Sequence, residues 1–439
     1  MGAAAILVAF CVCLVACMAL GWPVYVALAA GFVLFFGYGI FRGSGAVPLL
    51  KSCGKGVVSV LNILVAFMLI GMLTASWRFC GTIPAIVSAC VAFVHPAVFA
   101  VASFLMVALI SVLTGTAFGA AATMGTICMT LGQTLGCNEI VVGGAILAGA
   151  YVGDRWSPLS TSAMLAAQVT GTNQMDNLRA MAPRAVVPIV ASCALYLGLG
   201  FAFPAATTLA VLSLPYGQAF NLGAVTLLPA LSVIVLALLK ADVKLNMLVS
   251  LVLAVIIGAC YQGLDVSSIA RWLATGYAAS VAEIAATLDG GGLVSMVSPA
   301  IIILISSTYA GLFDATGLLD GLKGAIGRLA ARSNREFASI ACAVPLVALS
   351  CNQTLSTILQ QQILADQYPE DGKAMVLDIE DTVIVMAPLV PWSIAATVPL
   401  ASIGQPLVCI LLAFYLYLQP LWMLLAAVVR RRLHGGDGA

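Results

Sequence analysis

Long apolar runs follow one another through most of this 439-residue chain and constrain its fold more than any other feature. A backbone inside a bilayer has no water to bond, so a crossing segment must be helical or belong to a closed barrel. A spanning helix needs roughly 20 apolar residues. The windows that meet this length lie at 3–20, 22–40, 57–77, 139–169, 184–203, 222–239, 243–260, 294–313, 376–404 and 406–429. The sequence therefore predicts an all-α polytopic membrane protein.

The composition argues against several other classes of protein. Charged residues make up 8% of the chain and hydrophobic residues 62%, whereas about a quarter of the residues of a soluble protein are charged. The 13 cysteines include no C-x-x-C pair and there are two histidines, so we expect no metal site, disulfide framework or cofactor. An intramembrane enzyme would need a paired nucleophile and base, and the sequence shows none. A net charge of +1 gives no sign of a nucleic-acid partner.

Two further apolar stretches, 97–136 and 337–363, are interrupted near their middles by LTGTAFG and ALSCNQTLS. Irregular backbone at membrane depth persists only where protein or water satisfies its polar groups. We therefore predict two re-entrant helical hairpins, with a pair of true crossings as the open alternative. The candidate ion-binding residues at the hairpin tips are Thr114 and Thr116 in the first, and Asn352, Gln353 and Thr354 in the second.

Two of the apolar windows contain signals for a broken helix. In GAYVGDRWSPLSTSAM, residues 149–164, Asp154 and Arg155 are followed by Pro158. Proline lacks a backbone N–H and breaks a helix, which frees carbonyl groups near the charges. The window 376–404 carries Asp381 at the equivalent place, followed by Pro388 and Pro391.

The order of these features occurs twice. A span, a short helix, an interrupted hairpin and a broken span follow one another in 57–169 and again in 294–404. Five crossings per half give the two halves opposite orientations, and inverted repeats with discontinuous helices are typical of secondary transporters. The predicted repeats are 1–205, with hairpin 97–136 and broken helix 139–169, and 206–439, with hairpin 337–363 and broken helix 376–404.

Asp154 is the strongest candidate for the transport chemistry. A carboxylate at the centre of a span costs about 2.5 to 3.5 kcal/mol, so it usually faces a cavity or a partner. Burial favours its neutral form, which lets it exchange a proton for a cation. Four hydroxyls follow it and suit sodium, because a hard cation prefers oxygen ligands: those of Ser157, Ser160, Thr161 and Ser162. The structural alternative is that Asp154 and the adjacent Arg155 neutralise each other.

The other polar candidates also have structural alternatives. Asp381 could be an acid at a helix start, where the helix dipole favours negative charge. Asp378 and Glu380 precede the apolar run, and we expect them to be solvated at the membrane edge. Polar residues at the hairpin tips could serve only to hold helices together.

The basic residues predict the orientation. With a cytoplasmic N-terminus, fifteen of the 18 Lys and Arg residues fall on the cytoplasmic side, while Arg78 and Arg271 fall outside. This asymmetry is the one that the positive-inside rule expects. We therefore predict a multi-pass protein of the cell (plasma or inner) membrane with both termini in the cytoplasm.

Four motifs in order, ASWRFCGTIPAI, LTGTAFGAAATMG, GAILAGAYVGDRWSPLS and IEDTVIVMAPLVPWS, resemble the NhaC family of sodium/proton antiporters in the ion transporter superfamily. The resemblance runs from about Asn62 to Trp392. It implies exchange of sodium and protons, with no bound metal beyond the transported sodium. It also implies a scaffold, a moving transport domain that holds the hairpins and broken helices, and Asp154 and Asp381 as the family's acids there. A homodimer is compatible with it.

The chain departs from the family pattern at the presumed site. NhaC-like chains tend to read SPLSDTTNLA where this one reads SPLSTSAMLA, so Thr161 and Met164 replace an acid and an asparagine. Asn352 stands where the second hairpin tip tends to carry an acid. The leading prediction is a sodium/proton antiporter. The alternative is a proton- or sodium-coupled exchanger of a small organic anion (malate/lactate type) or an amino acid, with helix N-termini holding a carboxylate and Arg155 as its counter-charge.

Overall fold

The computed structural model describes residues 2–90, 95–203, 216–239, 241–281, 284–285, 288–330, 334–369 and 371–434. Every element in these ranges is a helix, apart from one antiparallel bridge between Tyr277 and Gly290. The prediction of an all-α protein is therefore confirmed. The helices of the first half are α1 (Ala3–Ala19), α2 (Val24–Phe41), α3 (Ala46–Phe79), α4 (Thr82–Cys90), α5 (Pro96–Thr114), α6 (Ala117–Ala120), the π-helical turn η1 (Ala121–Gly125), α7 (Thr126–Thr134), α8 (Glu139–Arg155), α9 (Thr161–Thr170) and α10 (Gln174–Ala202).

The second half contains more short helices and 3-10 turns. They are α12 (Tyr216–Ala219), η2 (Ala224–Leu227), α13 (Leu228–Leu238), α14 (Val243–Cys260), α15 (Val266–Thr275), α17 (Gly292–Ser295), α18 (Val297–Thr316), α19 (Asp320–Ala330), α20 (Arg335–Ser350), α21 (Gln353–Leu364), η3 (Ala365–Gln367), α22 (Gly372–Asp381), α23 (Val383–Met386), η4 (Ala387–Leu389), α24 (Ile394–Ser402), η5 (Leu407–Leu412) and α25 (Phe414–His434).

Fewer helices reach full membrane-spanning length than the apolar windows of the sequence suggest. Within the described ranges, five are long and apolar enough to cross a membrane: Val24–Phe41, Val60–Phe79, Pro96–Thr114, Gln174–Ala202 and Val243–Cys260. A sixth candidate is the pair Gly372–Leu389 and Ile394–Ser402, which bends by 58° at its break. Shorter apolar helices occupy Ala5–Leu14, Ala224–Ala237, Val297–Phe313 and Phe414–Val429. These findings are those of a multi-pass membrane protein.

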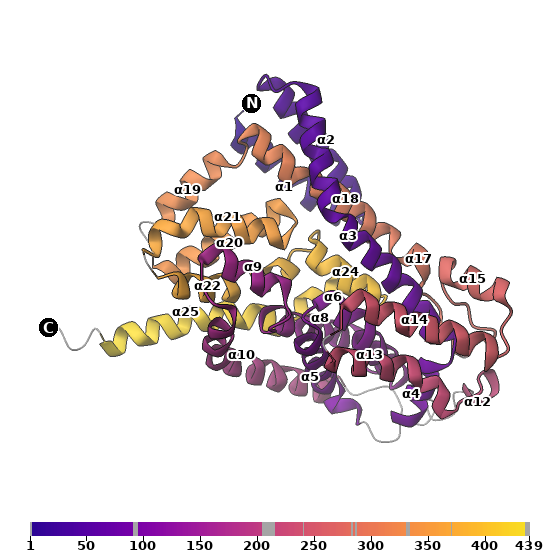
Figure 1. The fold of residues 1–439 in the computed structure, drawn as a ribbon. Coiled ribbons are helices and arrows are strands. Elements are labelled where there is room, and N and C mark those ends of the chain that lie inside the picture. The colour runs from indigo at the N-terminus through magenta and orange to yellow at the C-terminus, as the bar shows by residue number, and fades with distance from the viewer. Residues whose placement is uncertain are drawn as a thin grey trace.

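The helices form two groups. In the first, α18 packs against α2 and α3, and α14 also packs against α3 (Figure 1). Aromatic rings fill this contact, with Phe35 lying 4.9 Å from Phe10 and 5.0 Å from Tyr309 between ring centroids. Helix α3 begins at Ala46, well before the predicted window 57–77. Pro48 is compatible with this start, since it lies in the first turn, where a proline is tolerated.

The second group is built on a close contact between α5 and α8, with α10 and α25 packed beside them. Two glycines let the backbones of α5 and α8 meet. A Cβ atom at Gly153 would lie 2.1 Å from the carbonyl carbon of Ser111, and one at Gly149 would lie 2.5 Å from the carbonyl oxygen of Phe104. Small residues permit this kind of approach between membrane helices. The contact fixes α8, whose last two residues are Asp154 and Arg155, against the first hairpin.

Both interrupted stretches reverse direction at their polar residues. Helix α5 ends at Thr114, and Gly115 turns the chain with φ 69° before α6 begins. Helix α20 ends at Ser350, and Cys351 turns the chain with φ 55° before α21 begins at Gln353. Positive φ is strained for a residue with a side chain, so Cys351 is held by its surroundings. Each stretch is thus a helix-turn-helix unit.

Candidate functional site

The first broken helix is interrupted between α8 and α9. Residues 156–160 are not helical, and Pro158 lies within them. The Ser160 hydroxyl caps α9 by accepting from the N–H groups of Ser162 and Ala163, each at 3.2 Å, and it donates to the carbonyl of Asp154. The Ser157 hydroxyl donates to the carbonyl of Val112 on α5 at 2.6 Å. The hydroxyls of Ser157 and Ser160 therefore hold the non-helical segment in place through hydrogen bonds.

The second broken helix has a longer interruption. Helix α22 ends at Asp381, and α24 begins at Ile394 after the short α23 and η4. Pro388 is buried in η4, and Pro391 lies in the non-helical segment that follows. The indole N–H of Trp392 donates to the carbonyl of Ala348 on α20 at 2.7 Å. Each break thus contacts the hairpin that precedes it in the chain.

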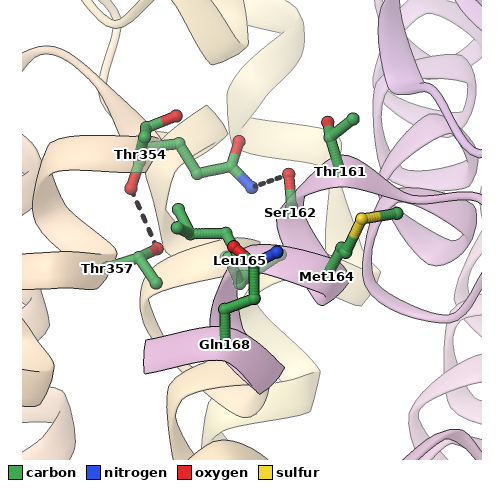
Figure 2. Close-up of a pocket in the computed structure, with 9 residues that line it drawn as sticks. Thr161, Ser162, Met164, Leu165, Gln168, Thr354 and Thr357 are labelled. Atoms are coloured by element: carbon green, nitrogen blue, oxygen red, sulfur yellow. Dashed lines mark hydrogen bonds between the residues drawn. The ribbon is translucent and has the colours of Figure 1, made fainter. Parts of the chain in front are cut away.

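Asp154 meets the second hairpin. Its side chain is buried, and its Oδ2 accepts a hydrogen bond of 2.9 Å from the side-chain amide of Gln353, the first residue of α21. The same amide nitrogen lies 3.2 Å from the hydroxyl of Ser162 (dashed line in Figure 2). The structure therefore brings the break of the first half and the hairpin tip of the second half together at one carboxylate.

A pocket of about 290 Å³ opens beside this contact. The side chains of Thr161, Ser162 and Met164 on α9 face Thr354 and Thr357 on α21 across it (Figure 2). Its full lining is Thr161, Ser162, Met164, Leu165, Gln168, Gln353, Thr354, Thr357 and Ile384, none of which carries a charge. The two positions that depart from the family pattern on α9, Thr161 and Met164, are thus pocket residues.

Arg155 has a different partner from the one that adjacency suggests. Its guanidinium is fully buried, forms an ion pair with Asp381 and donates to the hydroxyl of Tyr415 at 3.3 Å. Arg184 on α10 pairs with the other oxygen of Asp381 at 2.9 Å and with Asp378 at 3.1 Å.

The alternative that Arg155 neutralises Asp154 is therefore wrong. So is the alternative that Asp381 starts a helix, because α22 begins at Gly372 and ends at Asp381.

Asp378 and Glu380 are not solvated, and that expectation was wrong. Because α22 begins six residues before Asp378 and packs among α9, α10 and α25, both side chains are buried. Asp378 accepts from the hydroxyl of Tyr368 at 2.8 Å as well as from Arg184. In the part of the chain that the structure describes, neither carboxylate oxygen of Glu380 has a hydrogen-bond partner.

The remaining predicted residues satisfy their own helices. Thr114 donates to the carbonyl of Ile110 at 2.8 Å, and Thr116 caps α6 by accepting from Gly119 N–H at 3.3 Å. Asn352 caps α21 by accepting from Thr354 N–H at 2.9 Å. None of these three lines the pocket. Ser162, one of the predicted hydroxyls, does line the pocket. The sequence did not single out Gln168, although helical spacing from Thr161 could have indicated it.

Two interrupted helices meeting two helical hairpins around buried carboxylates define a secondary transporter. The chain belongs to the Na+/H+ antiporter family, whose model matches residues 1–180 and 149–429. The NhaC resemblance is thereby confirmed, and sodium and protons are the transported ions that membership implies.

Named relatives carry several cargoes. The chain is 25% identical to a malate-2H(+)/Na(+)-lactate antiporter of Bacillus subtilis, over 95% of this chain and 90% of that protein. It is 26% identical to the Na(+)/H(+) antiporter NhaC of Alkalihalophilus pseudofirmus, over 81% and 79% of the two chains. It is 27% identical to the arginine/ornithine antiporter ArcD of Halobacterium salinarum, over 82% and 76%. These relatives are antiporters.

Proposed function

We propose that this antiporter exchanges sodium for protons at a site centred on Asp154. The observation that carries the proposal is that Asp154 is buried at a helix break and bonded to a neutral amide, with no ion pair to it among the described residues. A buried charge is costly unless it is compensated. Asp154 therefore binds either a proton or a cation, and the two compete for the same carboxylate.

The neighbouring groups can complete a sodium site. The hydroxyl of Ser162 lies near the carboxylate of Asp154, because both accept a hydrogen bond from the side-chain amide of Gln353. Rotation of the Gln353 amide would present its oxygen instead of its nitrogen, which adds a third oxygen of the kind that hard cations prefer. Thr161 and Thr354 line the adjoining pocket. In this proposal, the other predicted residues hold the first helix break and the two hairpin tips in place. They are Ser157, Ser160, Thr114, Thr116 and Asn352.

The proposed architecture has two inverted repeats, 1–205 and 206–439. Its support is the parallel between the halves: Ser157 binds the first hairpin in one break, and Trp392 binds the second hairpin in the other. The group that contains the hairpins and broken helices is then the moving transport domain, and the group around α3 and α18 is the scaffold. The proposal also has both termini in the cytoplasm, as the distribution of basic residues predicts.

Transport in everted membrane vesicles tests whether sodium is exchanged for protons. A pH gradient is imposed, and sodium, lithium or potassium is added while the internal pH is followed with a dye. Sodium should dissipate the pH gradient, and lithium should do so to the same or a smaller extent. Vesicles without the protein should not respond. Absence of any cation-dependent proton movement at all tested pH values would reject sodium/proton exchange.

A second candidate function is coupled exchange of a small organic anion. The observation that favours it is the pocket, which at about 290 Å³ is far larger than a sodium ion and lacks charged residues. The first-turn residues of both α9 and α21 line it, and the positive ends of helix dipoles favour an anion. Counterflow of radiolabelled malate and lactate into proteoliposomes, with the organic cations arginine and ornithine for comparison, separates this candidate from pure ion exchange.

A further inference from the structure

Glu380 is a fully buried carboxyl group for which the ion pairs of the site provide no partner. It lies on α22, next to Asp381, and its side chain is 0% exposed. Both of its oxygens are without a hydrogen bond within the described residues. Its charge is close enough to interact with Arg155, Asp154 and Asp381. Glu380 therefore belongs to the same electrostatic cluster as the proposed sodium site.

The charges of this cluster do not balance when every group is ionised. Arg155 and Arg184 face four carboxyl groups, namely Asp154, Asp378, Glu380 and Asp381. The two arginines are engaged by Asp378 and Asp381, which also accept from Tyr368 and from Gln419. Among the described residues, Asp154 and Glu380 are the two acids of this cluster without an ion pair, so full ionisation leaves two excess negative charges in a buried region.

The other elements packed against α22 add no cation at this point. Helices α9, α21 and α23 contain no titratable side chain. On α25 the facing titratable group is Tyr415, which accepts from Arg155. On α20, Arg335 pairs with Glu336 at 3.6 Å and with Asp371 at 3.3 Å, at the far end of that helix from its tip. Among the described residues, the cations near Glu380 are arginines that already pair with Asp378 and Asp381, so a proton on Glu380 or a transported cation beside it is what can offset its charge.

We propose that Glu380 is a second proton-carrying carboxyl group of the exchange site, acting beside Asp154. This inference rests on the proposed sodium/proton exchange and adds to it. Before the cation binds, Asp154 and Glu380 each hold one proton. When sodium enters at Asp154, both O–H bonds break and both protons leave to water. Two protons thus leave for each sodium that enters, so one net negative charge stays in the site. It is shared by the two carboxylates, which face the sodium ion and the unpaired Nε–H of Arg155.

The test compares proton-to-sodium stoichiometry in proteoliposomes. The voltage at which sodium flux reverses is measured for the intact protein and for Glu380→Gln under fixed pH and sodium gradients. The variant should keep exchange but lose one proton per cycle, and its dependence of rate on pH should be less steep. Glu380→Asp keeps a carboxyl group and should retain the original proton count. Glu139→Gln, an exposed residue at the start of α8, controls for the loss of a carboxylate elsewhere.

Infrared difference spectra on sodium addition give an independent readout that leaves Glu380 in place. Protonated carboxylic acids have their own carbonyl stretch, and two such bands should vanish in the intact protein when sodium is added. On sodium addition, the Glu380→Gln protein should show one vanishing band, and the Glu139→Gln control should show both. Unchanged stoichiometry, pH profile and spectra in Glu380→Gln would overturn the inference while leaving sodium/proton exchange intact. If Glu380→Gln does not fold, a single carboxylic band in the intact protein overturns it equally. Failure of exchange in the intact protein would instead reject the proposed function.

Discussion

The side-chain amide of Gln353 donates to Asp154 at 2.9 Å and joins two segments that are 199 residues apart in the chain. One segment is the hairpin tip of the second half, and the other is the helix break of the first half. Gln353 also reaches Ser162 on the far side of that break. The carboxylate is thus held by a residue that must move if the hairpin and the broken helix separate.

Gln353→Ala should weaken sodium binding. In the proposed sodium-bound state the rotated amide oxygen of Gln353 binds the ion. Loss of such a contact with a charge costs about 1.5 to 3 kcal/mol, and about 1.4 kcal/mol corresponds to a factor of ten in affinity. The half-saturating sodium concentration for exchange should therefore rise roughly tenfold or more. Gln362→Ala on the same helix removes an exposed amide and should leave this concentration unchanged. A variant that matches the intact protein would show that Gln353 is not a ligand.

Asp154→Asn should abolish exchange and leave the fold intact. The amide is close in size to the carboxylate and can still bond to Gln353, but it carries no charge to trade between proton and sodium. Transport is measured in vesicles, and folding by the elution profile and melting temperature of the purified protein. Normal transport rates and pH dependence in this variant would remove Asp154 from the mechanism.

Arg155→Ala and Asp381→Ala should each destabilise the protein. Removal of one partner from a buried ion pair leaves the other charge uncompensated and costs about 3 to 5 kcal/mol. Thermal unfolding in detergent of the two single variants and the double variant forms a cycle. Because the residues are in contact, the double variant should be more stable than the sum of the single effects predicts, by up to about 3 kcal/mol. Strict additivity would mean that the contact is not a stabilising pair.

Gly153→Ala should destabilise the contact between α5 and α8. The new Cβ would lie 2.1 Å from the backbone of Ser111, and overpacking of this kind typically costs about 1 to 3 kcal/mol. Gly198→Ala on α10 is the matched control, since nothing lies within 4 Å of its Cβ position and alanine favours a helix over glycine. Melting temperatures of the two variants in the same detergent should move in opposite directions.

Thr161→Asp should discriminate between the two candidate cargoes. It places a carboxylate in the pocket lining, at a first-turn position of α9 that tolerates an acid. If the pocket holds an organic anion, repulsion should reduce uptake of that anion about tenfold or more, since like charges in a site cost several kcal/mol. Sodium-dependent proton movement should persist. Equal anion uptake by both proteins would mean that the anion binds elsewhere.

Much of the local structure follows from the sequence. Apolar length predicts helices because a backbone in lipid must bond internally, and Pro158 marks the first break because proline acts on its own helix. The turns at Gly115 and Cys351 fall within the polar interruptions that suggested hairpins. Helix starts are less exact, as the early beginning of α22 shows, because nothing in the local pattern reveals that Asp378 and Glu380 will be covered by other helices.

The sequence by itself determined that this is an all-helical membrane protein with broken helices and a carboxylate at Asp154. Only the tertiary structure decided how the charges are paired. Arg155 bonds to Asp381, 226 residues away, and leaves the adjacent Asp154 to Gln353. Helical geometry directs neighbouring side chains apart, so each charge finds its partner on whichever helix packs against its own face. That choice depends on the packing of the two halves of the chain, which spacing along the sequence does not encode.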